Sequence, residues 1–113
     1  MARVIVFVPD LLFGSSVTAA VQAAGHDPIL VGDPDQAKRE LPGAGLLIVD
    51  LTADASQRIA QASALDGVPK LAFYSHVEAD VRTQAEQAGF DLVVPRSRMA
   101  REGAALVSRL LSR

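Results

Sequence analysis

Five short apolar runs, rich in β-branched residues, alternate with five amphipathic or polar stretches along the 113 residues of the chain. The first run, residues 4–8, reads VIVFV and is apolar on both faces, which is typical of a central strand in a parallel sheet. Strands that alternate with helices favour parallel pairing, right-handed crossovers and helices on both faces of the sheet. We therefore predict one α/β domain over residues 1–113, with strands at residues 4–8, 28–31, 46–49, 71–74 and 92–94.

The predicted helices are marked by their ends and by apolar residues at helical spacing. Gly25 and Gly89 follow the first and fourth amphipathic stretches and are expected to end those helices. Asp33 before Pro34 predicts an N-cap with proline in the first turn of the second helix. The last helix is expected to bury one stripe of small and apolar residues: Met99, Gly103, Leu106 and Leu110.

Composition excludes several classes of site. The chain has no cysteine, which excludes disulfides, thiolate metal sites and cysteine nucleophiles. The net charge of −2 is too small to indicate nucleic acid or an anionic membrane as the main partner. No apolar run approaches the ~20 residues that span a bilayer, and the first run is too short for the core of a signal peptide. We expect a soluble, cytoplasmic protein.

Ligands of a doubly wound parallel sheet bind at the carboxyl ends of its strands, so the candidate site residues follow the runs, at positions 9–10, 50–52, 74–76 and 95–98. Over nearly its whole length the chain resembles the receiver (CheY-like) domain of response regulators. The best-matched pieces are residues 23–26 (AAGH), 47–51 (LIVDL) and 85–94, with Arg96 beyond them. The resemblance implies the flavodoxin-like strand order 2-1-3-4-5. It also implies that Asp50, at the end of the third strand, stands at the phosphate-accepting position.

The metal-binding positions depart from the receiver pattern. Receivers carry two acidic residues at the end of the first strand, and these hold the Mg²⁺ that neutralises the moving phosphoryl group. With Gly25 in register, Val8 and Pro9 occupy the two positions, and Asp10 is acidic one residue further on. Asp10 and Asp50 are the candidate metal ligands, and we expect metal binding to be badly weakened.

The switch positions are altered as well. The hydroxyl residue that ends the fourth strand of a receiver corresponds, counting back from Gly89, to Tyr74. Ser75 is one place on, where a side chain of a strand points to the opposite face. The fifth-strand lysine corresponds to Arg96, which keeps the charge but not the compact ammonium group.

Three functions remain open on these residues. The leading interpretation is a pseudo-receiver, which has no catalytic residue or cofactor and binds another protein. The alternative is a functional response regulator, phosphorylated on Asp50 by a histidine kinase with Mg²⁺ at Asp10 and Asp50. The third is a flavodoxin-like protein that binds a small ligand at the strand ends. A side chain of Arg96 against the Asp50 carboxylate would favour the first, and Mg²⁺ at both aspartates the second.

A partner surface is suggested by charge. Residues 95–113 contain five arginines and one acidic residue. Arg98 and Arg101 stand near the start of the last helix, where positive charge opposes the helix dipole. We expect them to meet an acidic patch on a partner, or on a second copy through Glu78, Asp80 and Glu86. The contact would then use the face of the fourth helix, fifth strand and fifth helix, as in receivers. The alternative is a solvated surface.

Weaker candidates lie elsewhere in the chain. Residues 14–16 (GSS) are expected in the first strand–helix loop, as an ordinary N-cap or as an anion cradle without the glycine fingerprint of nucleotide sites. His26 and His76 are the only histidines and lack a second ligand nearby, which disfavours zinc. Ser75 and His76 are adjacent without a nucleophile elbow, which disfavours a hydrolase.

Overall fold

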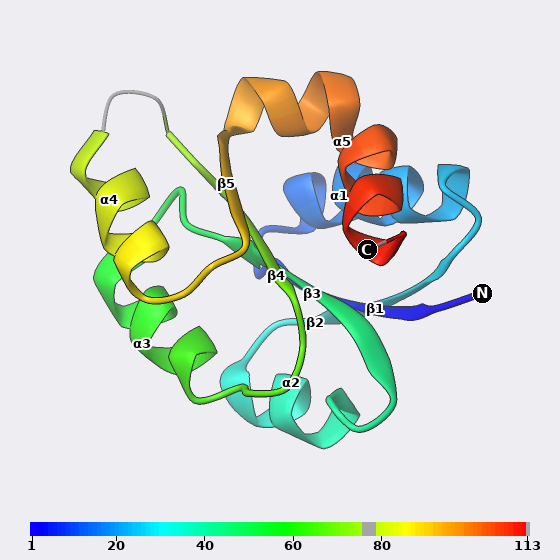
Figure 1. Ribbon diagram of the computed structural model, residues 1–113, viewed down its shortest axis with the longest axis horizontal. Helices are drawn as coiled ribbons and strands as arrows, with labels where there is room; N and C mark the ends of the chain where they lie inside the picture. Colours follow the sequence, from blue (N-terminus) through cyan, green and yellow to red (C-terminus); the bar gives the residue numbers. More distant parts are fainter. Residues whose placement is uncertain (76–78, 113) are drawn as a thin grey trace.

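The computed structural model describes residues 1–75 and 79–112, in which strands and helices alternate strictly (Figure 1). Each predicted strand is confirmed, with ends that differ by at most two residues. No helix in these two ranges is long and apolar enough to span a membrane. The strands are β1 (Arg3–Phe7), β2 (Asp27–Val31), β3 (Ala44–Asp50), β4 (Lys70–Tyr74) and β5 (Leu92–Pro95). The helices are α1 (Leu11–Ala23), α2 (Pro34–Glu40), α3 (Ala55–Ser63), α4 (Ala79–Gln87) and α5 (Arg96–Leu111).

The sheet has the order β2-β1-β3-β4-β5, and every neighbouring pair of strands is parallel. This confirms the predicted α/β, flavodoxin-like (CheY-like) doubly wound fold. The strand order reverses between β1 and β3, because the chain builds β2 on one side of β1 and then crosses to β3 on the other. The carboxyl ends of β1 and β3 meet at this switch point, where such folds place their ligands. Asp50, the last residue of β3, lies there.

Most helix ends follow the local signals in the sequence. Gly25 and Gly89 have φ angles of 85° and 93°, a left-handed conformation that glycine adopts without steric cost. The Asp33 carboxylate caps α2 by accepting a hydrogen bond of 2.9 Å from the backbone N–H of Gln36, and Pro34 opens the helix. These three predicted boundaries are confirmed.

The start of α1 was predicted wrongly. The helix begins at Leu11, because the Asp10 carboxylate accepts hydrogen bonds from the backbone N–H groups of Leu12 (2.9 Å) and Phe13 (3.1 Å). Residues 14–16 therefore lie inside the helix, not in a loop before it. Their amides are used within the helix, so neither the predicted N-cap nor the anion cradle forms there.

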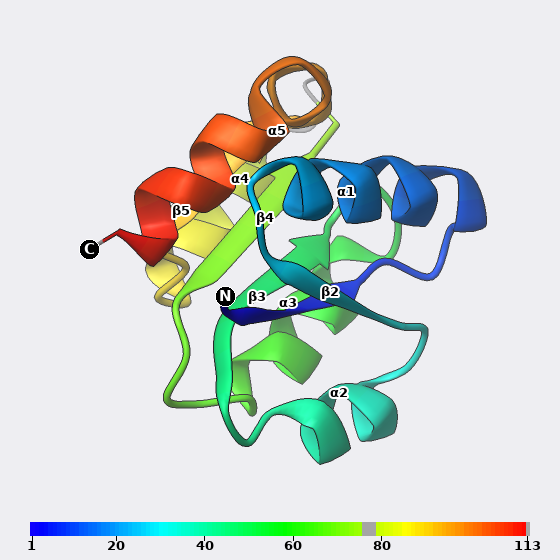
Figure 2. The same ribbon diagram turned by 90° about the vertical axis from the view of Figure 1, so that its right-hand side faces the viewer.

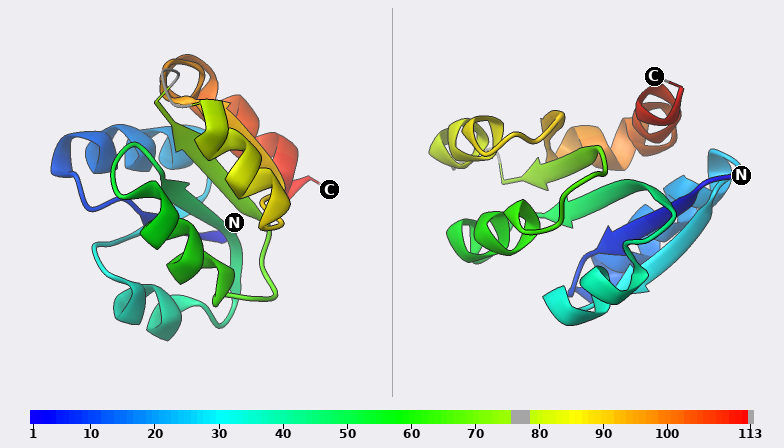
Figure 3. Two further views of the ribbon diagram at one scale, coloured as in Figure 1. Left: turned by 90° about the vertical axis from the view of Figure 1, so that its left-hand side faces the viewer. Right: turned by 60° about the horizontal axis from the view of Figure 1, so that its bottom comes forward.

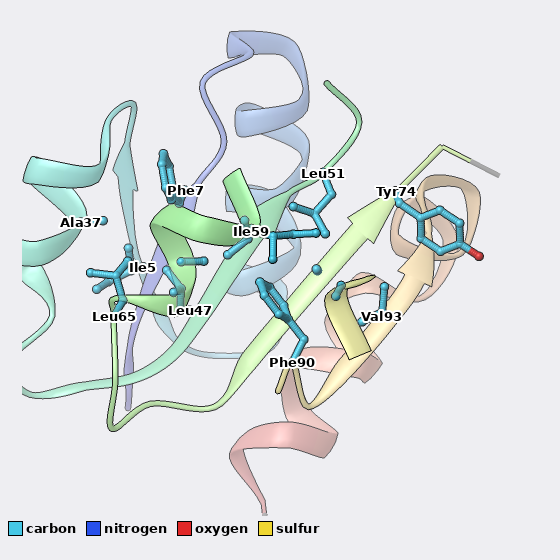
Figure 4. Packing of buried hydrophobic residues seen from close by; sticks show 14 of the residues in the cluster. Ile5, Phe7, Ala37, Leu47, Leu51, Ile59, Leu65, Tyr74, Phe90 and Val93 are labelled. Carbon is cyan, nitrogen blue, oxygen red and sulfur yellow. The ribbon is translucent and has the colours of Figure 1, made fainter. Parts of the chain in front are cut away.

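The two faces of the sheet carry separate apolar clusters. Helices α1 and α5 cover one face, and α2, α3 and α4 cover the other (Figures 1 and 2). Figure 3 shows the second layer from two further sides, and Figure 4 shows its packing. Side chains of each strand alternate between the clusters: Ile5 and Phe7 pack under α2–α4, whereas Val4 and Val6 pack under α1 and α5. The predicted stripe of α5 is buried as expected: Met99, Gly103, Leu106 and Leu110.

Helices α1 and α5 approach closely at one point. A Cβ atom placed on Gly103 would lie 2.9 Å from the Cβ of Ala20, closer than packed side chains tolerate. Glycine at position 103 therefore allows this approach of the two helices. The contact lets α5 pack directly against α1 over this face of the sheet.

Candidate functional site

Asp50 lies in a line of side chains that crosses the carboxyl end of the sheet. Strand pairing places Asp50 beside Phe73 of β4, and Phe73 beside Val94 of β5. The register of β1 against β3, continued by one residue, places Val8 on the other side of Asp50. Val8, Phe73 and Val94 all belong to the cluster under α1 and α5, and the alternation along β3 directs Asp50 to the same face. We call these four residues the carboxyl-end row.

The Asp50 carboxylate is buried, with 5% of the residue exposed, and is held by its own turn. Its Oδ1 accepts hydrogen bonds from the backbone N–H of Thr52 (2.8 Å) and from the Thr52 hydroxyl (2.6 Å). Thr52 is its only hydrogen-bond donor in the described part of the chain. The backbone oxygen of Asp50 accepts a bond of 3.3 Å from Arg58, whose guanidinium lies 5.0 Å from the centroid of the Phe7 ring.

The sequence placed Thr52 at the strand-end edge but predicted no role for it, and it did not indicate Arg58. The Asp-x-Thr spacing is a signal for a local side-chain turn and could have identified Thr52. Arg58 comes from α3, and its approach to β3 has no equivalent local signal.

Asp10, the other candidate metal ligand, is exposed and serves as the N-cap of α1. Its Oδ1 already accepts two backbone hydrogen bonds, as the Asp50 Oδ1 does. Across residues 1–75 and 79–112 no three acidic or histidine side chains gather where a metal ion could be held. Mg²⁺ prefers an octahedral set of oxygen ligands. Each of the two carboxylates already has one oxygen engaged in hydrogen bonds, and the apolar Val8 lies beside Asp50 in the carboxyl-end row. The two aspartates therefore fit an octahedral Mg²⁺ site poorly.

Arg96 does not contact Asp50. Its guanidinium lies 4.9 Å from the centroid of the Phe13 ring, against the first turns of α1. The Phe13 ring in turn meets Phe73 edge-on, with the centroids 6.2 Å apart. No hydrogen bond or ion pair joins Arg96 to Asp50 within the described residues. A contact between Arg96 and the Asp50 carboxylate was expected to favour the pseudo-receiver interpretation. The Arg96 guanidinium instead lies over the ring of Phe13.

Tyr74, at the predicted switch position, lies on the opposite face of the sheet. It is buried in the cluster under α2–α4, away from the face of Asp50 (Figure 4). Tyr74 also interacts with Arg82 of α4. The pKa of Arg82 is raised, chiefly by the neighbouring Glu86 carboxylate and to a smaller extent by Tyr74. Ser75 follows β4 and is half-buried. His76 and Glu78, which the sequence analysis considered, lie outside the described residues.

A cavity of about 80 Å³ opens between α1 and α5 at the carboxyl end of the sheet. It is smaller than the roughly 300–1,000 Å³ of typical small-molecule sites. We call it the α1–α5 cavity. It was not predicted, because its walls come from helices at opposite ends of the sequence. Its lining is mostly apolar: Phe13, Val17, Ala20, Phe73, Met99 and Ala100, with Ser16 and Arg96 as the polar members.

The arginines of α5 differ in their surroundings. Arg98 pairs with Glu102 one turn away, at 3.4 Å. The Nε of Arg101 donates a weak bond of 3.3 Å to the backbone oxygen of Ser97, and the residue is exposed. Pro95 precedes the helix and supplies no side-chain cap. The start of α5 is therefore electropositive, and only one of these charges is balanced by a neighbour in the described residues.

Comparison with known proteins identifies the fold through solved structures. No protein-family model and no curated protein sequence matches the chain. Several solved structures match over nearly their whole length. A response regulator from Thermotoga maritima has a TM-score of 0.84 and 14% identity, covering 100% of this chain and 99% of that one. A response regulator receiver protein from Burkholderia phymatum has a TM-score of 0.82 and 20% identity, covering 99% and 96%.

A third match has a metal in its site. The receiver domain of a sensor histidine kinase from Pseudomonas aeruginosa, with a magnesium ion coordinated in its active-site cleft, has a TM-score of 0.78 and 17% identity. It covers 99% of this chain and 98% of that one. Identities this low establish the fold and leave the activity open. The chain therefore has the fold of response-regulator receiver domains, the CheY-like arrangement that its sequence resembles.

Proposed function

We propose that the chain is a receiver-type signalling module that no longer accepts phosphate, has no catalytic activity of its own and works by binding another protein. The observation that carries the proposal is the carboxyl-end row. Asp50, at the phosphate-accepting position, is flanked across the sheet by Val8 and Phe73.

The chemistry of phosphoryl transfer supports this interpretation. Transfer depends on metal ions and positioned charges that neutralise the moving group. The side chains next to Asp50 are apolar, and the nearest remaining acid, Asp10, caps a helix. Arg96 holds the position of the receiver lysine, but its guanidinium is stacked on Phe13. The charges that transfer needs are thus missing or engaged elsewhere.

The small-ligand interpretation has less support. The α1–α5 cavity measures only about 80 Å³ and lies between two helices. Of the described residues, Phe73 is the one residue of a strand that lines it. A flavin or nucleotide would need a larger cleft with several convergent polar groups.

We assign the partner surface to the exposed side of α5, through Arg98 and Arg101. Partner surfaces of this kind recognise opposite charge, which raises association rates and suppresses wrong partners. Asp80 of α4 is exposed, whereas Glu86 already pairs with Arg82 at 3.4 Å. A second copy that used the face of α4, β5 and α5 would therefore offer Asp80, whereas its Glu86 is already paired with Arg82. An acidic partner protein is the better-supported occupant of this surface.

The test is a set of amide spectra of the ¹⁵N-labelled chain, recorded with and without Mg²⁺ and beryllofluoride, a phosphoryl analogue. We expect the signals of Asp50 and its neighbours to stay almost unchanged, because the second and third carboxylates of a receiver site are absent. Saturable shifts at millimolar Mg²⁺ that disappear in Asp50→Asn would overturn the proposal. They would establish the alternative, a response regulator that is phosphorylated on Asp50.

A further inference from the structure

The first turn of α1 exposes two leucines. Leu11 is 78% exposed and Leu12 is 84% exposed, more than any other large apolar side chain of the described residues except Met1. A single exposed leucine is common on protein surfaces, so its exposure alone does not mark an interaction site. What matters is what each of the two leucines lies beside.

The two leucines lie on different sides of α1. Leu12 precedes Ser16 by one helical turn, and side chains four residues apart share a helix face. Because Ser16 lines the α1–α5 cavity, helical spacing places Leu12 beside one wall of that cavity. Leu11 lies one turn before Gly14, whose Cβ position is 3.1 Å from Leu30 of β2. Leu11 thus adjoins the edge of the sheet and not the cavity.

The α1–α5 cavity is suited to an aliphatic side chain. Its apolar lining includes Phe13, Phe73 and Met99, and the rings of Phe13 and Phe73 meet edge-on. Its volume of about 80 Å³ is several times the roughly 10–15 Å³ that one water molecule needs, so the cavity has room for a group larger than water. Leu12 of the same chain does not fill it, because that side chain is directed into solvent.

Charge complements the apolar contact. Arg96 borders the cavity and makes no ion pair within residues 1–75 and 79–112. Asp10 stands two residues before Leu12, is exposed, and likewise makes no ion pair in those ranges. The same small surface therefore presents an apolar side chain next to an acid, and an apolar cavity next to a cation.

We propose that this surface binds a second copy of the chain. A surface that holds both a projecting group and the cavity for it, side by side, is self-complementary about a two-fold axis. Leu12 of each copy enters the α1–α5 cavity of the other, and Arg96 of each copy meets Asp10 of the other. Figure 2 shows α1 and α5 side by side over one face of the sheet. The second copy would pack against these two helices. The dimer is independent of the proposed function, because it does not use Arg98 or Arg101.

Sedimentation velocity over a concentration series, from micromolar to millimolar, tests the proposal. We expect the wild-type chain to form a dimer and Leu12→Ser to weaken it by about tenfold or more. The matched control is Leu11→Ser, which removes a similarly exposed leucine on the other side of α1 and should leave the dimer within about twofold of wild type. Leu12→Gln provides a second variant in case Leu12→Ser reduces helix formation, and thermal melts check the fold of each.

Two further variants separate the charges. Asp10→Asn keeps a good N-cap and removes the charge, so the dimer should weaken and lose most of its dependence on salt. Arg98→Glu combined with Arg101→Glu should leave the dimer unchanged. A chain that stays monomeric at millimolar concentration would overturn the proposal. So would equal losses in Leu11→Ser and Leu12→Ser, or loss of the dimer in the α5 double variant.

Discussion

The guanidinium of Arg96 lies 4.9 Å from the centroid of the Phe13 ring and so joins the start of α5 to the first turns of α1. Arg96, which the sequence resemblance assigns to the position of the receiver lysine, thus contributes to helix packing. Arg96→Gln should remove about 0.5–1 kcal/mol of stability, the usual range for an exposed cation–π contact. Phe13→Leu should cost more, about 1–2 kcal/mol, because it also removes the edge contact with Phe73.

Urea denaturation of both single variants and the double variant measures this coupling. The double-mutant cycle should return an interaction energy of at least about 0.5 kcal/mol. Strictly additive losses would show that the stack contributes nothing to stability.

Asp50→Asn should be tolerated or mildly stabilising. Asparagine keeps an acceptor for Thr52 and removes a buried charge that has no cationic partner in the described residues. We expect the free energy of unfolding to change by less than about 1 kcal/mol. Chemical denaturation with the wild type as reference measures it. A loss above roughly 2 kcal/mol would instead mean that the charge of Asp50 is paired, because breaking a buried pair costs several kcal/mol.

Thr52→Val should destabilise the chain by about 1.5–3 kcal/mol at neutral pH, because it removes a hydroxyl donor from a buried carboxylate. Thr52→Ser keeps the hydroxyl and is the control. In the Asp50→Asn background the same change should cost less, since the acceptor is then neutral. An equal cost in both backgrounds would mean that the threonine acts through its packing alone.

Gly103→Ala should lower stability although alanine is the better helix former. The new Cβ would lie 2.9 Å from the Cβ of Ala20, and overpacking costs about 1–3 kcal/mol against a propensity gain of about 1 kcal/mol. Gly103→Ala in an Ala20→Gly background removes the clash and should be neutral or favourable there. Thermal melts of the four combinations decide this. If Gly103→Ala raises the melting temperature of the wild type, α1 and α5 separate more easily than this contact implies.

Arg98→Glu combined with Arg101→Glu should leave the melting temperature nearly unchanged. The Arg98–Glu102 pair is solvent-exposed and worth at most about 1 kcal/mol, and glutamate near a helix start interacts better with the dipole. Titration with a polyglutamate peptide at low salt should shift the amide signals of α5 in the wild type and not in this variant. Lys38→Glu with Arg39→Glu on α2 is the control and should keep the shifts. Equal responses of the two variants would show that α5 is only a solvated surface.

The elements that the sequence predicts correctly are those with local signals. The β-branched run at residues 4–8 forms a buried central strand, and Gly25 and Asp33 end and begin helices where such residues do so by conformation or capping. The start of α1 was missed because Asp10 was assigned to a metal site. Its side chain satisfies helix amides, which is the commoner role of an aspartate before an apolar helix.

The candidate site is predicted less well, for a different reason. The position of Asp50 follows from β3, whose apolar run is encoded locally, and from the strand order, which the resemblance to receivers implied. The stack of Arg96 on Phe13 and the α1–α5 cavity depend on how two helices from opposite ends of the chain pack. Periodicity indicates which helix face is buried but not which side chains of another helix it meets.

The strand order also determines how readily the backbone amides of each strand exchange their hydrogen with solvent. Strands β1 and β3 lie inside the sheet, and their core residues from Val4 to Phe7 and from Leu46 to Val49 have at most 1% exposure. Their amides are released only when the whole domain opens, so their exchange rates report the global free energy of unfolding. Strand β2 pairs with β1 alone, and Leu30 on it is 45% exposed. We therefore expect the amides of β2 to exchange through local fraying, before those of β1 and β3.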